Sequence, residues 1–375
     1  MTSRDIEAIE REQKEDKVVD EAELDDSVLP ILYRITSFGA DYDAAGLVSR
    51  LQREDIFIPP FQRSFVWTQK EASRFIESLL LGLPVPGVFF ARDTDTKKLL
   101  VIDGQQRLRS IQYFVEGYFN PSQSNDRKTV FKLINVQKRW EALTYQTITE
   151  ADRILLRDTI IHATIVQQES PKEKNHSSIY LIFERLNTTG RKLSPQQIRV
   201  AIYHGAFLNL LNELNEYKPW RELFGNNSKT LKDQELILRF VALYLEWNKY
   251  GDTEETRTIK GFLNDFTYRN RHCNEPFCLS TASLFKSTID IAKLSLGKSA
   301  FRPERALNTA VFDSVMVGIS TRLHNGGIAD INSLQSRYEG LFKNDQYIRS
   351  IVRATSDTRS VKTRCEIAIE AFSDV

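Results

Sequence analysis

Strand and helix patterns are segregated along this 375-residue chain, and that segregation constrains its fold more than any other feature. Before residue 206, short apolar runs that stop at turns predict strands, and amphipathic runs between them predict helices. After about residue 206 only helical spacing remains. We therefore predict an α+β domain over residues 30–205 and an all-helical domain over residues 206–375, preceded by an acidic flexible tail over residues 1–29.

Several elements of the first domain have recognisable boundaries. Ser194 is a predicted helix N-cap, because Pro195 suits the first helical position and Gln197 stands three residues after the cap. The other predicted helices cover residues 44–53, 69–81 and 105–116, and the predicted strands cover residues 56–58, 88–92, 98–102, 130–136 and 159–167.

Charge and cysteine content narrow the class of protein. Residues 1–28 carry a net charge of −7, and the remainder of the chain carries +8. A mildly basic remainder is compatible with a polyanion partner such as DNA, and equally with an ordinary protein surface. Three cysteines without a CxxC pair predict free thiols, not a disulfide frame or a zinc site. The N-terminus has no secretory signal and no stretch is long enough to span a membrane, so we expect a cytoplasmic protein.

Polar residues stand where a predicted strand turns into a helix, in the sequence DGQQR. A helix N-terminus offers unpaired N–H groups and a positive dipole to phosphate. Gly104 allows close backbone approach, Gln105 and Gln106 can donate amide hydrogen bonds, and Arg107 can bind phosphate in a bidentate way. Asp103 could hold Arg107, orient a water or bind a metal-held phosphate. A nucleotide-phosphate pocket and a plain strand-to-helix turn both fit these residues.

Two further clusters add amide and basic groups. In IPPFQRSFVW, Gln62 and Arg63 suit contact with a nucleotide or nucleic acid, whereas Phe65 and Trp67 are better explained as core. In FERLNTTGRKLSPQQIR, Asn187 suits a tight turn.

Arg199 follows that turn on the next helix, so it could face the same pocket or pair with an acid. Other chemistries lack their motifs: the chain has no GxxxxGK[ST] loop, no HExxH and no GxSxG, and its five histidines are scattered.

Together, IPPFQRSFVW, DGQQRL, FERLNTTGRKLSPQQIR, KDQELILRFVALY and KGFLNDF closely resemble the GmrSD-type restriction endonuclease N-terminal domain family, also known as domain of unknown function 262. The resemblance runs from about residue 45 to about residue 270. It implies a ParB/sulfiredoxin-like fold for the first domain and a nucleotide-binding, often NTP-hydrolysing module of bacterial anti-phage restriction systems that sense or attack modified DNA. The implied catalytic residues are Asp103, Gln106 and Arg107, and the implied pocket residues are Gln62, Arg63, Gly104, Gln105, Asn187 and Arg199.

Three functions follow from the resemblance and the residues. The first is hydrolysis of an NTP, whose base is unknown, with Mg²⁺ and on or near DNA. In this hypothesis the chain lacks the His-Asn-His nuclease half that many relatives carry. The second is a non-catalytic, nucleotide-gated DNA-binding or regulatory subunit that recruits a separate nuclease. The third, ranked last for want of a clear metal-ligand set, is a nuclease that uses Asp103 and Glu184 around a metal. A second copy of the chain is a further candidate partner, and a membrane is not.

Overall fold

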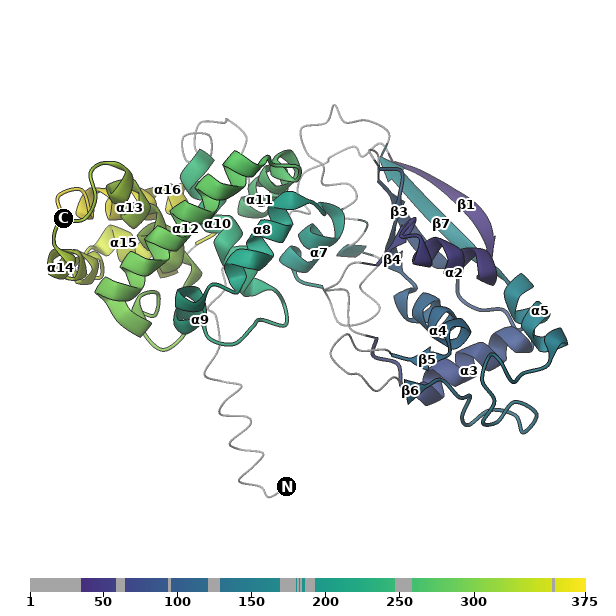
Figure 1. Cartoon of the computed structure of the whole chain (residues 1–375). Helices are drawn as coiled ribbons and strands as arrows, with labels where there is room; N and C mark the ends of the chain where they lie inside the picture. The colour runs from purple at the N-terminus through teal and green to yellow at the C-terminus, as the bar shows by residue number, and fades with distance from the viewer. Residues whose placement is uncertain are drawn as a thin grey trace, which may run out of the picture. The chain divides into compact units, whose positions relative to one another are not determined.

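The computed structural model describes residues 35–58, 65–93, 96–120, 129–168, 180, 182, 184–185, 193–246, 258–352 and 355–375. Among these residues the chain divides into two compact units. The sheet unit lies within residues 32–193 and includes residues 200–202, whereas the helical unit contains residues 194–199 and 203–375. In Figure 1 the sheet unit runs from purple to teal, and the helical unit from teal-green to yellow.

A five-stranded mixed sheet organises the sheet unit. Its strand order is β1-β7-β3-β4-β2, with β1 antiparallel to β7, β3 parallel to β7, β4 antiparallel to β3 and β2 parallel to β4. The strands are β1 (Ile35–Asp43), β2 (Ile56–Phe57), β3 (Val88–Arg92), β4 (Leu99–Asp103) and β7 (Ile160–Gln168). A separate two-stranded ladder joins β5 (Tyr118–Phe119) to β6 (Thr129–Val130).

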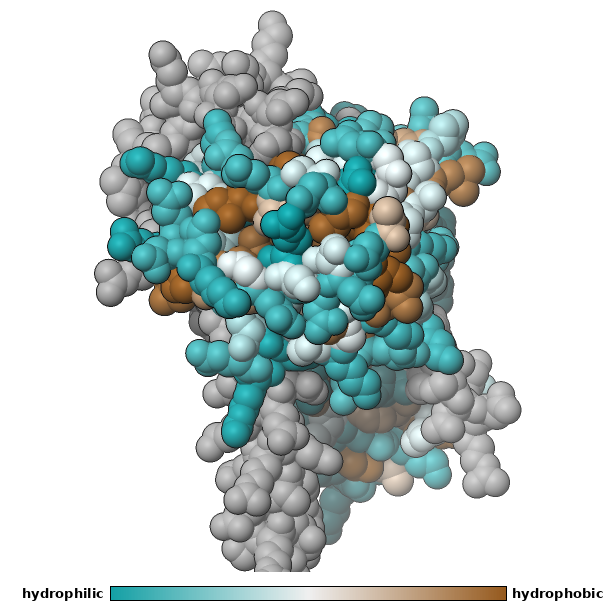
Figure 2. Space-filling view, turned by 90° about the vertical axis from the view of Figure 1, so that its left-hand side faces the viewer, coloured by the Kyte–Doolittle hydropathy of each residue, from teal (hydrophilic) through white to brown (hydrophobic). Residues whose placement is uncertain are grey.

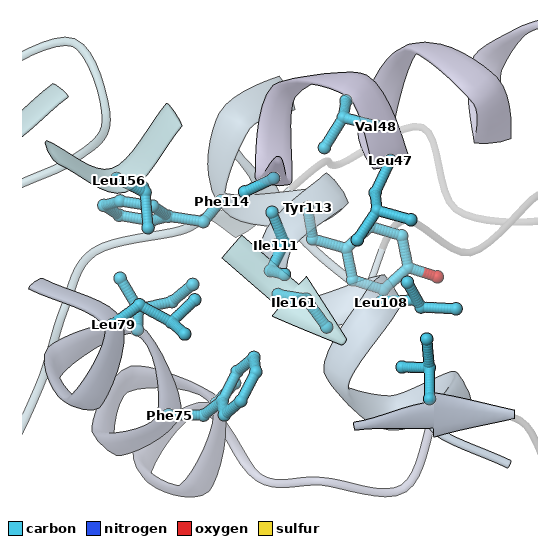
Figure 3. Close-up of a cluster of buried hydrophobic side chains, with 14 of the residues drawn as sticks. Leu47, Val48, Phe75, Leu79, Leu108, Ile111, Tyr113, Phe114, Leu156 and Ile161 are labelled. Atoms are coloured by element: carbon cyan, nitrogen blue, oxygen red, sulfur yellow. The ribbon is translucent and has the colours of Figure 1, made fainter. Parts of the chain in front are cut away.

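Four helices pack on one face of this sheet. They are α2 (Ala44–Gln52), α3 (Gln69–Leu80), α4 (Gln105–Glu116) and α5 (Glu150–Asp158). Alternate strand residues such as Val88, Phe90 and Val101 point into the same buried cluster as the apolar stripes of the helices. Figure 3 shows Phe75, Leu79, Ile111 and other side chains of α2, α3, α4, α5 and β7 in this cluster. The opposite face of the sheet is therefore the face that these four helices leave uncovered.

Most predicted elements of the sheet unit are confirmed to within a residue or two. The predicted strand over 130–136 is wrong beyond Val130: Phe131 and Leu133 are buried, but residues 131–136 belong to no strand. β1 and α5 were not predicted. The mixed α+β architecture is confirmed, whereas its ParB/sulfiredoxin-like assignment stays a prediction.

The helical unit contains no strand among its described residues, as its sequence pattern predicts. The start of α7 (Pro195–Ile202), whose last three residues are counted with the sheet unit, is confirmed: the Ser194 hydroxyl accepts a hydrogen bond from the N–H of Gln197, and the Gln197 side chain accepts one from the N–H of Ser194. The helices that follow are α8 (Ala206–Asn215), α9 (Lys218–Phe224), α10 (Lys232–Glu246), α11 (Ile259–Asn270), α12 (Glu275–Leu296), α13 (Thr309–His324), α14 (Ile331–Leu341), α15 (Asp345–Val352) and α16 (Thr358–Ala371).

A buried charge cluster ties three of these helices together. Asp313 of α13 accepts two hydrogen bonds from Arg239 of α10, at 3.0 and 2.5 Å, and one from Arg364 of α16 at 2.9 Å. All three residues are buried. Since a buried charge is tolerated only when it is paired, this cluster fixes α10, α13 and α16 against one another.

The surface of the helical unit is mainly hydrophilic on the face that Figure 2 presents, with separate hydrophobic patches instead of one continuous apolar face. Among the described helices, none combines the length and the hydrophobicity that are needed to cross a membrane.

Candidate nucleotide site

The junction between β4 and α4 requires a glycine. β4 ends at Asp103, and Gly104 occupies the N-cap position of α4 with φ 98°. A Cβ on Gly104 would lie 2.5 Å from Cγ1 of the buried Val88, so no larger residue fits without displacement. Because glycine has no side chain to cap the helix, the first turn of α4 lacks the side-chain acceptor that most helices have. Its N–H groups and positive dipole end are suited to an anion.

Arg107 is held in place by two acceptors beside this helix start. Its Nη2 donates to Oδ2 of Asp103 at 2.8 Å and to the carbonyl oxygen of Gly87 at 2.9 Å. The Arg107 side chain is only 16% exposed, whereas Asp103 is 46% exposed. Within the described part of the chain, Nη1 of Arg107 and Oδ1 of Asp103 have no hydrogen-bond partner. The junction therefore presents one oriented cationic donor and one carboxylate oxygen that remain available for a ligand.

Gln106 has a positioning role in the structure. Its Oε1 accepts hydrogen bonds from the backbone N–H groups of Val66 at 3.0 Å and Trp67 at 3.2 Å. These bonds bring the end of the IPPFQRSFVW motif to the first turn of α4. They commit the side-chain amide oxygen of Gln106 to the backbone, and the catalytic role of Gln106 stays a prediction.

Phe65 and Trp67 of that motif pack in or against the core, as predicted. Phe65 packs edge-on against Tyr113 with ring centroids 5.2 Å apart, and Trp67 packs against Phe75 at 5.6 Å. Three predicted pocket residues, Gln62, Arg63 and Asn187, lie outside the described residues. Gln105 is half-buried at the start of α4, beside Arg107 in sequence.

Arg199 is buried and belongs to the helical unit, whereas Asp103 belongs to the sheet unit. Its Nε donates to Oδ1 of Asn264 at 2.8 Å, and its Nη1 donates to Oε2 of Glu235 at 2.9 Å. Lys232 also donates to Glu235, at 2.6 Å. The structure thus shows the alternative in which Arg199 pairs with an acid, and its predicted place in the nucleotide pocket is not supported by these contacts.

Glu235 should make the protein sensitive to acid. Burial raises the pKa of Glu235, but Lys232 and Arg199 together lower it by more, to about 2 from an ordinary value of 4.5. Because the folded-state pKa is depressed, the stabilisation is complete above pH 4.5 and is lost as the pH falls towards 2. Between pH 6 and the acid end of this range, we expect the free energy of unfolding of Glu235→Gln to fall by about 3 kcal/mol less than that of the wild type. Urea unfolding between pH 6 and pH 2.5 measures this difference, and Glu304→Gln, at an exposed position, is the control. The expectation is contradicted if the free energy of unfolding depends on pH in the same way in the two variants.

Two other observations bear on what the site can hold. In the described residues no group of three or more His, Cys, Asp or Glu side chains could ligate a metal ion. A Mg²⁺ ion usually takes only one or two protein carboxylates together with substrate phosphates, so Oδ1 of Asp103 would suffice beside a nucleotide. A pocket of about 320 Å³ lies among α2, α4 and α5, but it includes none of the predicted site residues.

Comparison with known families locates this junction within a recognised segment. Residues 45–204 match the model of the GmrSD restriction endonuclease, N-terminal domain. The match supports the GmrSD N-terminal family for this segment, which contains the whole Asp103–Arg107 junction. It covers less than half of the chain and ends well before residue 270, where the sequence resemblance extends.

A curated relative is an uncharacterized protein of Methanocaldococcus jannaschii, 22% identical over 258 residues. The alignment covers 48% of this chain and 43% of the relative, so the chain spans less than half the length of the protein it matches. The name of that relative assigns no function. The GmrSD match alone therefore connects the chain to restriction.

Proposed function

We propose that the sheet unit binds and hydrolyses a nucleoside triphosphate, with Mg²⁺, as part of a restriction or anti-phage defence system that acts on DNA. The observation that carries the proposal is the junction itself: an uncapped helix start at Gly104, with the Arg107 guanidinium fixed by Asp103 and Gly87 and its Nη1 left without a partner in the described residues. The GmrSD match supports the restriction context.

The chemistry of these groups suits a triphosphate. Backbone N–H groups at the start of α4 would bind phosphate oxygens, and Nη1 of Arg107 would add a charge-assisted hydrogen bond. Asp103 orients Arg107, and its second carboxylate oxygen would hold Mg²⁺ against the phosphates. The Mg²⁺ ion would neutralise phosphate charge. The proposal also includes DNA and a separate nuclease subunit as partners, and the cytoplasm as the location.

The position of Gln106 favours a second candidate, nucleotide-gated binding without hydrolysis. Gln106 joins the first turn of α4 to the backbone of Val66 and Trp67, so a ligand at that turn would also restrain the segment that follows Gln62 and Arg63. In this alternative the bound nucleotide shifts a conformational equilibrium, and a partner nuclease cleaves DNA.

Replacing Arg107 by alanine should abolish turnover at this site. We expect phosphate release from the preferred nucleotide among GTP, ATP, CTP and UTP, with Mg²⁺, to fall about 100-fold or more, because one oriented donor to developing charge is lost. Arg109→Ala is the matched control, since it removes an arginine from the same helix that contacts Gln112 and Tyr113 instead.

Each result separates the two candidates. Turnover that is lost in Arg107→Ala and retained in Arg109→Ala supports the NTPase. Nucleotide binding that raises DNA affinity without any product selects the gated subunit. If the wild type neither binds nor hydrolyses any of the four nucleotides, with or without DNA, both candidates are wrong.

A further inference from the structure

An aspartate and a histidine face each other at the edge of the sheet. Asp41 of β1 is in register with His162 of β7, and Oδ1 of Asp41 lies 2.8 Å from Nδ1 of His162. A carboxylate only accepts hydrogen bonds, so the shared proton resides on Nδ1 and the lone pair on Nε2. Among the described residues Nε2 has no partner, and the side chains of His162 and Asp41 are 62% and 66% exposed. The pair thus presents an oriented imidazole whose basic nitrogen faces solvent.

Two glycines leave space for His162. A Cβ on Gly39 would lie 2.8 Å from Cε1 of the imidazole, and a Cβ on Gly87 would lie 2.6 Å from the His162 carbonyl oxygen. Real Cβ contacts are not this short, so a side chain at either position would displace the histidine. Glycine at both positions therefore keeps the imidazole close to the backbone of its neighbouring strands.

The strand register places this pair on the same face of the sheet as Asp103. Asp103 pairs with Phe89 just beyond a bulge in the β3–β4 ladder, and Phe89 is opposite Thr164, which lies two residues from His162 on β7. Cross-strand partners share a face, and so do residues two apart on a regular strand, but the bulge interrupts this alternation between Val101 and Asp103. Only β3 lies between β4 and β7, so two strand spacings and a two-residue offset along β7 separate Asp103 from His162, about 12 Å in all.

Gly87 connects the two groups directly. Its carbonyl oxygen accepts the hydrogen bond from Arg107, and its α-carbon lies against the His162 carbonyl. A phosphate chain that begins at Arg107 and runs across β3 would therefore approach His162 with its terminal phosphate. His162 itself lies on the face opposite the four helices, because its neighbours Ile161 and Ala163 belong to the helix-side cluster, and its side chain is 62% exposed.

We propose that His162, oriented by Asp41, is the general base of the NTP hydrolysis; this inference rests on the proposed function. Nε2 takes a proton from a water molecule whose oxygen forms a bond to the terminal phosphorus, while the bond from that phosphorus to the bridging oxygen breaks. The products are the nucleoside diphosphate and inorganic phosphate, and His162 afterwards releases the proton to solvent. Asp41 is a positioning residue, which fixes the tautomer and stabilises the imidazolium.

The test measures turnover and nucleotide affinity separately in the full-length chain. The variants are His162→Gln and Asp41→Asn, with the exposed His324→Gln of the helical unit as control. We expect His162→Gln to lower kcat about 100-fold, the usual contribution of a general base, with unchanged nucleotide affinity. Asp41→Asn should lower kcat less. Because both side chains are largely exposed, Tm should not change in either variant.

Chemical rescue distinguishes catalysis from a structural role. Added imidazole should restore part of the turnover of His162→Gly, which a merely structural effect would not allow. If His162→Gln keeps kcat within twofold while Arg107→Ala loses it, the general-base role is wrong and the NTPase stands. If the wild type has no turnover, the proposed function fails, and this role fails with it.

Discussion

Asp313→Ala is expected to destabilise the helical unit by about 3–5 kcal/mol, a large part of the stability of an ordinary domain. Asp313 is the anion between Arg239 and Arg364, and its carboxylate oxygens lie 2.5–3.0 Å from their nitrogens. Removing it leaves two buried guanidinium groups without their shared counter-charge. Asp313→Asn should be nearly as harmful, since it retains the volume but not the charge.

Denaturant unfolding followed by the helical signal measures this loss, with Asp290→Ala as the control. Asp290 lies on the neighbouring α12 but is exposed, where it accepts a hydrogen bond from Tyr217, so its loss should change the stability by less than about 0.5 kcal/mol. A triple variant, Arg239→Met, Asp313→Leu and Arg364→Met, should recover most of the stability, because an apolar cluster needs no counter-charge. Equal stability of Asp313→Ala and Asp290→Ala would contradict a role for this charge cluster.

Local sequence signals predicted the helix boundaries because the interactions that set them are local. The Ser194–Gln197 capping box and the helix over Gln105–Glu116 depend on residues within one or two turns. β1 was missed because its pairing partner, β7, is more than 100 residues away, and an edge strand shows little of the alternation of a buried one. The run after Val130 was overpredicted because two buried residues at alternate positions, Phe131 and Leu133, have the spacing of a strand, although β6 ends at Val130.

The site residues that lie within one turn of the sequence could be predicted, whereas contacts between residues far apart in the sequence could not. The sequence DGQQR predicted that Asp103, Gly104 and Arg107 lie together, because the end of a strand and the start of a helix are adjacent in sequence. The acceptor role of Gln106 was not predicted because it depends on Val66 and Trp67, which only tertiary structure brings near. The pairing of His162 with Asp41 was not foreseen for the same reason, since it required the unpredicted β1.

Gly104→Ala is expected to lower the stability of the sheet unit by about 2–5 kcal/mol and to remove nucleotide turnover. One part of the effect is conformational: φ 98° is disfavoured for an L-residue by about 1–2 kcal/mol. The other part is steric: the new methyl group would lie 2.5 Å from Cγ1 of Val88, and such overpacking costs about 1–3 kcal/mol. Relief of that contact should also move Arg107, whose Nη2 would lie 3.3 Å from the methyl group.

A double-mutant cycle with Val88→Ala separates the two parts. Val88→Ala removes the 2.5 Å contact with Cγ1 and leaves the milder 3.0 Å contact with Cβ, so Gly104→Ala in that background should lose most of its steric part, and the coupling should exceed about 0.5 kcal/mol. Gly82→Ala is the conformational control, because Gly82 has φ +66° and no atom within 4 Å of a built Cβ. If Gly104→Ala costs no more than Gly82→Ala, the close approach of β3 to the β4–α4 junction is not required. The helix start would then tolerate a side chain, and the reason for a glycine at the predicted phosphate site would have to come from the ligand.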